Sequence, residues 1–368
     1  MKSSRDIKLL FKRLKKMNNF LVLNALLIVC ISISTIYSAT ISRTTSFYVK
    51  ESIWAVIGLV AYLIVTMIDY RKYLKYYKVL YIINIFILLS IFFIGVSRLG
   101  AQRWITFGPV SLQPSEMGKV LVVLTLSAFL STYFKDKLVG VKSVFIAGAH
   151  IAPILLLILK QPDLGTTLII VMTFSVMIFM CDLDWKTIIL LGTSAVAFVP
   201  FAYFFLLKDY QRQRVLTFLN PEADVLGSGW NVTQSMIAIG SGELYGKGFL
   251  NSSQSKLRFL PEAHTDFIVS VFLEERGFLG GVLLFGLYFA LIMQIIYIAE
   301  TTTDRFGKLI CYGIASIFFF HFVINVGMTM GIMPVTGKPL LLMSYGGTSL
   351  LISFIMLGIV QSVRIYRD

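Results

Sequence analysis

The sequence predicts an all-α polytopic membrane protein, and three observations support this fold class. Hydrophobic residues make up 57% of the 368 positions, and charged residues only 14%. Apolar stretches of roughly twenty residues, the length of a membrane-spanning helix, recur along the whole chain. The gaps between them are loop-sized, so no soluble domain is left over. We therefore predict a single integral membrane domain over residues 1–368.

About ten stretches have the length and composition of a transmembrane helix. They cover residues 18–39, 50–69, 77–96, 115–134, 142–159, 164–181, 186–207, 266–299, 306–333 and 340–363. The longest gap separates the seventh stretch from the eighth. We expect one large extracytoplasmic loop there, over residues 208–265.

The basic residues sort by side of the membrane. The chain has 33 Lys plus Arg against 19 Asp plus Glu. More than half of the basic residues fall in segments that are cytoplasmic if the N-terminus is cytoplasmic, as the positive-inside rule requires. This pattern predicts cytoplasmic N- and C-termini and argues against a nucleic-acid partner.

Residues 1–17 have apolar positions on one helical face, with Lys and Arg interleaved. We interpret them as a cytoplasmic basic amphipathic segment on anionic lipid. An ordinary positive-inside flank is the alternative, and it predicts the same orientation.

Several function classes lack their usual motifs. The sequence has no CxxC, HExxH, Walker-type or GxGxxG motif, which argues against nucleotide-driven pumping and zinc chemistry. Cys30, Cys181 and Cys311 lie inside apolar stretches, and we interpret them as buried small hydrophobes. No internal repeat stands out, which weakens the case for an inverted-repeat transporter.

The first of four polar clusters covers residues 100–119. Ser115 is a candidate N-cap of the fourth span, and Glu116 and Lys119 are then i, i+3 on one face. A structural ion pair and a functional site explain these two charges equally well. Trp104 fits an interfacial aromatic residue.

The second cluster is the tight turn at residues 160–167, between the fifth and sixth spans. Asp163 can cap the following helix, which alone would account for the acid. The string from Gln161 to Gly165 is nonetheless unusually specific for a turn.

The third cluster is the long loop itself. Its basic and acidic residues nearly cancel, which is unlike a surface for polyanions. Arg212 and Arg214, with amides and glycines between them, are suited to gripping pyrophosphate and sugar hydroxyls. A solvated loop is the alternative, although the apolar residues 236–239 indicate that part of it folds back onto the membrane domain.

His264 and Asp266 close this loop where the eighth span begins. A carboxylate there can act as a general base, and a helix N-terminus would lower its pKa and keep it charged. A helix cap is an equally good explanation of Asp266. We expect Glu274, Glu275 and Arg276, farther along, to balance one another.

The fourth cluster contains His321 and Asn325, which are i, i+4 in the ninth span, followed by residues 334–339 and 344–349. The Pro and Gly breaks predict an irregular segment protected by neighbouring protein. We interpret His321 and Asn325 as interhelical hydrogen-bond partners rather than ligands.

In this order the clusters resemble the SEDS family (shape, elongation, division and sporulation), in particular its RodA-type elongation members. The resemblance spans nearly the whole chain, and the stretch 214–221 favours the elongation type over the division type, FtsW. The motifs that carry it are Trp104 with 114–116 and Lys119, and residues 161–166, 210–212 with 220–221, 234–242, 261–267, 334–337 and 344–347.

The resemblance implies a peptidoglycan glycosyltransferase that polymerises lipid II and releases undecaprenyl pyrophosphate. It also implies ten spans with the large loop outside the bacterial cytoplasmic membrane. Asp266 matches the key acid of the family, and Trp104, Glu116, Lys119 and Asp163 match other important positions. We predict that the substrate-binding residues are Arg103, Trp104, Glu116, Lys119, Gln161, Asp163, Arg212, Arg214, His264 and Lys338.

The mechanism we expect has Asp266 as the general base in an inverting transfer from a lipid-linked donor. Cations among Arg103, Lys119, Arg212 and Arg214 would stabilise the leaving group. The sequence leaves open whether a divalent cation, Mg²⁺ or Mn²⁺, assists.

Two rival functions are a lipid II flippase and a non-catalytic scaffold of the elongation machinery. Polar residues that gather in the predicted outer half of the membrane favour the enzyme. The partners we expect are lipid II, the nascent glycan strand, a class B penicillin-binding protein with transpeptidase activity, and other membrane proteins of the elongation complex.

The chain departs from the family pattern at two places. Residues 274–277 read Glu-Glu-Arg-Gly where Glu-Glu-Leu-Gly is usual, and Lys338 stands at a position that is often apolar or small. Each departure adds a charge near the predicted outer boundary.

Overall fold

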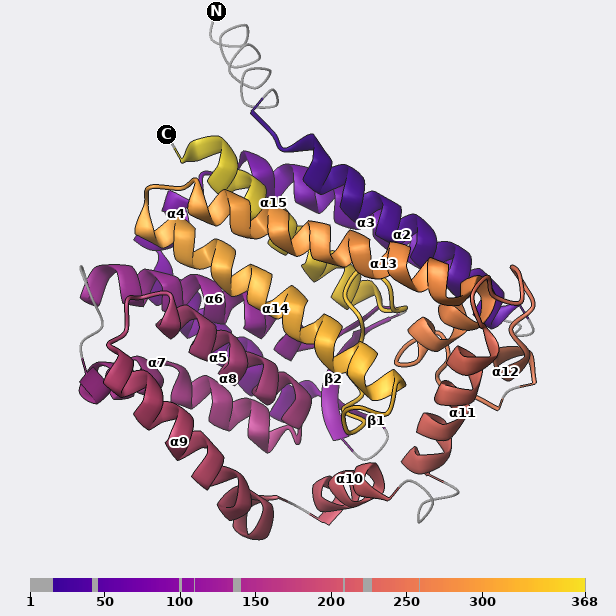
Figure 1. The fold of residues 1–368 in the computed structure, drawn as a ribbon. Helices are drawn as coiled ribbons and strands as arrows, with labels where there is room; N and C mark the ends of the chain where they lie inside the picture. The colour runs from indigo at the N-terminus through magenta and orange to yellow at the C-terminus, as the bar shows by residue number, and fades with distance from the viewer. Residues whose placement is uncertain are drawn as a thin grey trace, which may run out of the picture.

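The computed structural model shows a mainly helical membrane domain in which long helices run up and down between two ends (Figure 1). It describes residues 16–41, 46–98, 101–108, 110–134, 140–207, 209–220, 227–257 and 259–367. Most of the predicted amphipathic segment, residues 1–15, therefore lies outside the described residues. The C-terminal end of the last helix and the start of the first described helix lie at the same end of the bundle (Figure 1).

Ten apolar helices correspond to the ten predicted spans. Eight are long and apolar enough to cross a membrane, and two are shorter. They are α2 (Asn19–Thr40), α3 (Phe47–Met67), α5 (Tyr77–Ile94), α6 (Pro114–Tyr133), α7 (Gly140–Lys160), α8 (Leu164–Phe179), α9 (Trp185–Phe201), α13 (Ile268–Glu300), α14 (Arg305–Thr329) and α15 (Gly347–Tyr366). A short helix, α4 (Arg71–Lys75), links α3 to α5, and a π-helix, η1 (Ala202–Leu206), extends α9.

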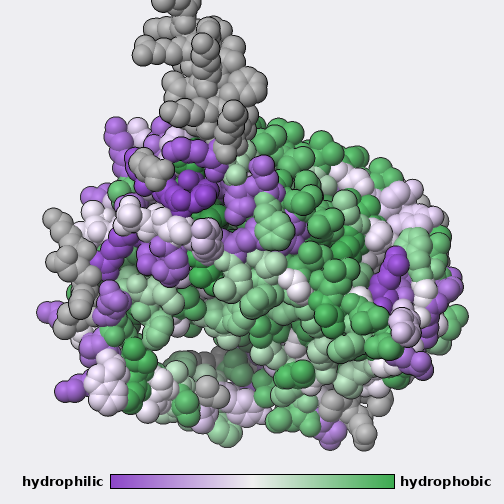
Figure 2. Space-filling view, turned by 45° about the horizontal axis from the view of Figure 1, so that its top comes forward, coloured by the Kyte–Doolittle hydropathy of each residue, from purple (hydrophilic) through white to green (hydrophobic). Residues whose placement is uncertain are grey.

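Helices α6, α14 and α15 form the centre of the bundle, where most of their residues are buried. Close approach is possible where small residues meet large ones: a Cβ on Gly58 of α3 would lie 2.4 Å from the ring of Phe354 on α15. The outer helices α3, α5 and α7 have few buried residues and expose large hydrophobic side chains such as Val56, Phe86 and Phe145. Figure 2 shows broad hydrophobic areas on one face of the molecule. Such a surface suits contact with lipid.

Cys181 and Cys311 are buried, as predicted, whereas Cys30 is exposed on α2. The prediction for Cys30 was wrong because, in a membrane protein, a hydrophobic residue can face lipid instead of the core.

A three-stranded antiparallel sheet between α5 and α6 was not predicted. It consists of β1 (Val96–Arg98), β2 (Ala101–Phe107) and β3 (Val110–Leu112), in the order β1-β2-β3. Gly108, with φ of 58°, provides the left-handed turn between β2 and β3. The sheet places Trp104 and Ser111 at the end of the bundle where α6 begins.

The long loop between α9 and α13 contains three helices, α10 (Asp209–Leu219), α11 (Ser228–Ser241) and α12 (Ser253–Lys256). Helix α11 folds back and packs against α13 and α14, which confirms the expectation drawn from residues 236–239. The contact itself uses Ser235 and Ala238, which are fully buried, while Met236 and Ile237 stay exposed.

Helix α13 is broken at Gly277, where φ is 64° and ψ is −165°. The loop segment 243–248 fills the break with four backbone hydrogen bonds. Carbonyls of Glu274 and Glu275 accept from Lys247 and Gly248 at 2.9 and 3.0 Å. On the other side of the break, amides of residues 278 and 279 donate to carbonyls of residues 243 and 244. The backbone groups that the helix gives up are thus satisfied within the protein, as a nonpolar environment requires.

Candidate functional site

A cavity of about 500 Å³ opens at the end of the bundle where α13 begins. It is formed by α3, the small sheet, the start of α6, the turn before α13, and the irregular segment between α14 and α15. Its lining includes Lys50, Trp54, Trp104, Ser111, Gln113, Glu116, Thr265, Asp266, Gly337, Tyr345, Thr348 and Ser349. Three residues predicted from the sequence, Trp104, Glu116 and Asp266, therefore face one cavity.

Asp266 stands in the last turn before α13, with its side chain partly exposed. The N-cap of α13 is Phe267, and no side chain caps this helix, so the interpretation of Asp266 as a helix cap was wrong. Among the residues that the structure describes, none donates a hydrogen bond to the Asp266 carboxylate. The carboxylate is thus free to meet a ligand in the cavity.

Burial raises the pKa of Asp266 to about 6, and the nearby Glu262 carboxylate adds to the rise. The positive charges of Lys338 and Arg214 oppose it. The expected lowering by a helix N-terminus was therefore wrong, because burial outweighs it. With a pKa near 6 the carboxylate is mostly ionised at pH 7 and is a stronger base than an ordinary aspartate.

His264 is buried and packs between two aromatic rings of the cavity wall. Its ring centroid lies 4.6 Å from that of Phe47 and 5.5 Å from that of Tyr345. Its carbonyl also accepts a hydrogen bond from the Tyr345 amide at 2.9 Å. These contacts fix the turn that carries Asp266 against the segment before α15.

Glu116 and Lys119 form the predicted i, i+3 ion pair on α6, with 3.0 Å between carboxylate and ammonium. Both side chains are buried, and the Lys119 ammonium also lies 2.5 Å from Nε2 of His321 on α14. Nδ1 of His321 is 2.8 Å from the Pro339 carbonyl. Glu116 lines the cavity, whereas Lys119 lies behind it and links α6 to α14.

Asp163 and Lys338 form a second buried pair, with 2.7 Å between Oδ1 and Nζ. Asp163 also caps α8 by accepting from the Thr166 amide, as predicted, and Lys338 donates to Thr166 Oγ1 at 2.6 Å. Lys338 holds the pKa of Asp163 well below its usual range, against the effect of burial. The Lys338 ammonium is thus committed to Asp163.

Ser115, predicted as the N-cap of α6, lies inside that helix, whose N-cap is Gln113. Its hydroxyl instead donates to Asp163 at 3.3 Å. The prediction failed because Pro114 takes the first helical position, for which its fixed φ is suited.

Arg103 and Gln161 have structural partners next to the cavity. The Arg103 guanidinium donates to the carbonyls of Gln161 and Pro162. The Gln161 side chain donates to the Leu88 carbonyl at 3.0 Å. These bonds tie the turn after α7 to the sheet and to α5.

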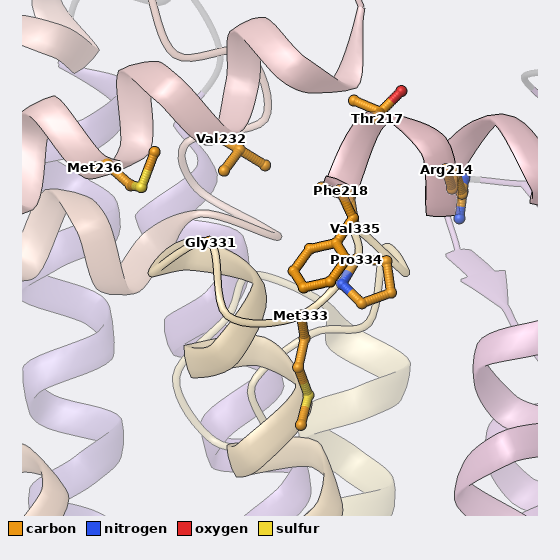
Figure 3. A pocket seen from close by; sticks show the side chains of 9 residues that line it. All are labelled: Arg214, Thr217, Phe218, Val232, Met236, Gly331, Met333, Pro334 and Val335. Carbon is orange, nitrogen blue, oxygen red and sulfur yellow. The ribbon is translucent and has the colours of Figure 1, made fainter. Parts of the chain in front are cut away.

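The two loop arginines do not line the cavity. Arg212 donates to the carbonyls of Tyr203 and Phe204 at the end of α9 and η1. Arg214 lies at the edge of a small pocket of about 40 Å³, in which Phe218 of α10 reaches toward Pro334 and Val335 (Figure 3). Helix α10 thus holds the Arg212 guanidinium at η1, whereas Arg214 stays close enough for its positive charge to act on Asp266.

Glu274, Glu275 and Arg276, which we expected to balance one another, do so only in part: the Arg276 charge acts on Glu275, but each side chain also has a partner outside the group. Glu274 is bound by Lys247 at 2.7 Å and by the Ser252 and Ser253 hydroxyls at 2.6 and 2.7 Å. Glu275 accepts from Ser38 of α2, and the Arg276 guanidinium lies over the ring of Phe249, 5.4 Å from its centroid. Each charge has its own partner, and most of these partners come from the long loop.

Lys50 and Trp54, on the first turns of α3, were missed as cavity residues. Lys50 is exposed, and both side chains line the cavity. A cation and an indole four residues apart at a span end are the only local signal, and interfacial anchoring explains that pattern equally well.

Within the described part of the chain, no three His, Cys, Asp or Glu side chains are grouped so that they could hold a metal ion. The only carboxylates on the cavity wall there are Glu116 and Asp266, and Glu116 is already paired with Lys119.

Fold and site together define a class: a polytopic membrane protein with a polar cavity at one end, lined by an aspartate to which no described residue donates a hydrogen bond. Residues 14–368 match the family described as cell cycle protein, FtsW/RodA/SpoVE. The chain belongs to this family.

Named relatives agree with this assignment. The chain is 41% identical to peptidoglycan glycosyltransferase MrdB of Escherichia coli (strain K12), over 84% of this chain and 83% of the relative. It is 35% identical to peptidoglycan glycosyltransferase RodA of Treponema pallidum (strain Nichols), over 94% of this chain and 96% of the relative.

Solved structures share the fold. A component of a peptidoglycan synthase complex, described as coordinating polymerization and crosslinking, gives a TM-score of 0.81 at 30% identity and covers 96% of this chain and 99% of that one. The rod shape determining protein RodA of Thermus thermophilus gives a TM-score of 0.71 at 27% identity. The match covers 96% of this chain and 98% of that one.

Proposed function

We propose that this chain is a peptidoglycan glycosyltransferase that polymerises lipid II into glycan strands during cell elongation. The observation that carries the proposal is Asp266, an unbonded carboxylate that faces the cavity with its pKa raised to about 6. A base with a pKa near working pH is suited to removing a proton from a sugar hydroxyl. The family membership and the activities named for its relatives support the same reaction.

The reaction is a transfer with inversion at the anomeric carbon. Asp266 accepts the proton from the 4-hydroxyl of the acceptor N-acetylglucosamine. The freed oxygen forms a bond to the anomeric carbon of the lipid-linked donor, and the bond from that carbon to the pyrophosphate breaks. Undecaprenyl pyrophosphate leaves with the bonding electrons. One base and a good leaving group suffice, so a second catalytic carboxylate of the glycosidase kind is not needed.

Lys50 is the cation best placed to stabilise the pyrophosphate. It is the one Lys or Arg among the described residues that line the cavity, and it is exposed there. Three cations predicted to bind substrate are instead bound to protein groups around the cavity. They are Arg103, Lys119 and Lys338. We assign them the role of holding the cavity walls in place, while Trp104 supplies an aromatic surface on which a sugar can stack.

In the cell, this reaction takes place at the outer face of the bacterial cytoplasmic membrane, with both termini cytoplasmic. The charge distribution of the sequence supports that orientation, as does the position of the start of α2 and the end of α15 at the same end of the bundle. The similarity to a component of a peptidoglycan synthase complex supports a class B penicillin-binding protein as the partner that crosslinks the product.

The proposal is tested with purified protein in vesicles that contain labelled lipid II. Polymer is measured on gels, and transbilayer movement of lipid II is measured separately. We expect wild-type protein and the control Asp209→Asn, in which an exposed carboxylate on α10 is removed, to make polymer. Asp266→Ala and Asp266→Asn should make none while remaining folded. Polymer at the wild-type level from Asp266→Ala would refute the role of Asp266, and movement without polymer would favour the flippase.

A further inference from the structure

Asn325 of α14 holds two separate parts of the cavity with one amide group. Its Nδ2 donates to the Asp266 carbonyl at 3.0 Å and to the Lys338 carbonyl at 2.8 Å. The residue is fully buried. A single side chain therefore ties the turn before α13 to the segment between α14 and α15.

The first of these bonds bears on the position of the Asp266 carboxylate. No described residue donates a hydrogen bond to that carboxylate, so its place in the cavity follows from the position of its backbone. Within its own turn, the amides of Thr265 and Phe267 bond to the Glu262 carbonyl at 3.1 and 3.4 Å. The bond from Asn325 is what attaches the Asp266 peptide itself to another helix.

The second bond fixes the neighbour of that carboxylate. Lys338 follows Gly337, which has φ of 66°, and a Cβ at Gly337 would lie 3.5 Å from Oδ2 of Asp266. The next residue, Pro339, is held through its carbonyl by His321, one turn before Asn325 on α14. Helix α14 thus sets the spacing between the carboxylate and the cavity wall that faces it.

We propose that Asn325 is a positioning residue for the base, which rests on the glycosyltransferase function proposed above. By holding both carbonyls, it keeps the Asp266 carboxylate at a fixed distance from the Gly337 wall and hence from the acceptor hydroxyl. Proton transfer requires hydrogen-bond distance, so a small displacement of the base lowers the rate of the chemical step more than it lowers substrate binding.

A purely structural role must be separated from this one, because buried amides commonly join helices in membranes. Asn24 of α2 provides the matched control. It is also buried, and its Nδ2 donates to the Leu287 carbonyl of α13 at 2.9 Å. It is not among the residues that line the cavity. Asn24→Ala removes an equivalent buried amide without altering the site.

The experiment compares wild type, Asn325→Ala, Asn325→Asp, Asn24→Ala and Asp266→Ala in the lipid II polymerisation assay. Asn325→Asp keeps the shape of the side chain and loses both donors, so it remains informative if the alanine variant folds poorly. We expect both Asn325 variants to lower kcat by about 10- to 100-fold with KM for lipid II nearly unchanged. Asn24→Ala should retain kcat within about twofold, although its thermal unfolding temperature also falls.

The inference is overturned if both Asn325 variants keep the wild-type kcat, or lose no more kcat than Asn24→Ala does. A raised KM with unchanged kcat would also overturn it. Failure of wild-type protein to make polymer would instead count against the proposed function, so the two failures are distinct.

Discussion

Removing Lys338 should destabilise the protein through Asp163, its buried partner. Asp163 is 1% exposed and lies 2.7 Å from the Lys338 ammonium. Replacing Lys338 by Met keeps the length of the side chain but leaves the carboxylate without its cation. Breaking a buried pair in this way costs about 3–5 kcal/mol, because the remaining charge is uncompensated.

For Lys338→Met we expect a cost near the lower end of this range of about 3–5 kcal/mol. Asp163 keeps hydrogen bonds from the Thr166 amide at 3.1 Å and the Thr166 hydroxyl at 2.8 Å. The Gln113 amide and the Ser115 hydroxyl add contacts at 3.2 and 3.3 Å. Because these donors still stabilise the carboxylate, we expect Lys338→Met to lose about 3 kcal/mol of unfolding free energy.

A double-mutant cycle measures the pair itself. We expect Asp163→Asn to cost about as much as Lys338→Met, and the double variant to cost far less than the sum, with a coupling of about 2–3 kcal/mol. The measurement is reversible unfolding in mixed micelles. Lys308→Met, which breaks the exposed pair with Glu300, is the control and should cost less than about 1 kcal/mol.

The pH dependence gives a second check on the same pair. Lys338 lowers the pKa of Asp163 in the folded state. The ion pair therefore adds its full stabilisation of the folded protein above the unfolded-state pKa of Asp163, about 3.9. That stabilisation is lost as the pH falls through the lower folded-state pKa. Without Lys338, burial should raise that pKa instead, and the variant should gain stability relative to wild type as the pH falls from 7 toward about 4. Additive single costs, or a stability gap that is constant with pH, would refute the reasoning.

Three further predictions follow from single features. The raised pKa of Asp266 predicts that kcat/KM for polymerisation rises with pH to half its maximum near pH 6; a profile already flat at pH 5 would contradict it. Gly277→Ala should cost about 1–3 kcal/mol of unfolding free energy, because φ is +64° and the new Cβ would lie 2.4 Å from the Gly246 nitrogen. Gly286→Ala, with open space around it, should cost nothing, and equal losses would show that the break does not matter. Arg212→Ala should keep the polymerisation rate within about twofold, since its guanidinium caps η1 away from the cavity; a large loss would restore it as a binding residue.

The spans could be predicted because hydrophobicity and length are local properties of the chain. All ten predicted stretches correspond to apolar helices. The pair of Glu116 and Lys119 was also foreseen, since helical spacing alone brings them together. Arg212 was misplaced because residue type says what a side chain can bind but does not say where a loop helix will carry it.

Contacts between distant segments could not be predicted from the sequence, for a different reason. Lys338 looked like a departure from the family pattern near the boundary, yet it is the partner of Asp163, 175 positions away. The Asp266 bond from Asn325 likewise joins α14 to the turn before α13. A charge or an amide in a span implies that some partner exists, since an unpaired one would be costly, but only the packing of the helices identifies it.

The break in α13 shows how these contacts connect the long loop to the site. Residues 268–276 form a short helical piece between Asp266 and Gly277, and segment 243–248 supplies the backbone bonds that the break leaves open. Glu274, on the same piece, is bound by Lys247 and by two serines near α12. Because only Phe267 separates Asp266 from this piece, a shift of the loop relative to α13 would act on Asp266 through it. Asn325 opposes such a shift from the other side, so the position of the carboxylate is set jointly by the loop and by α14.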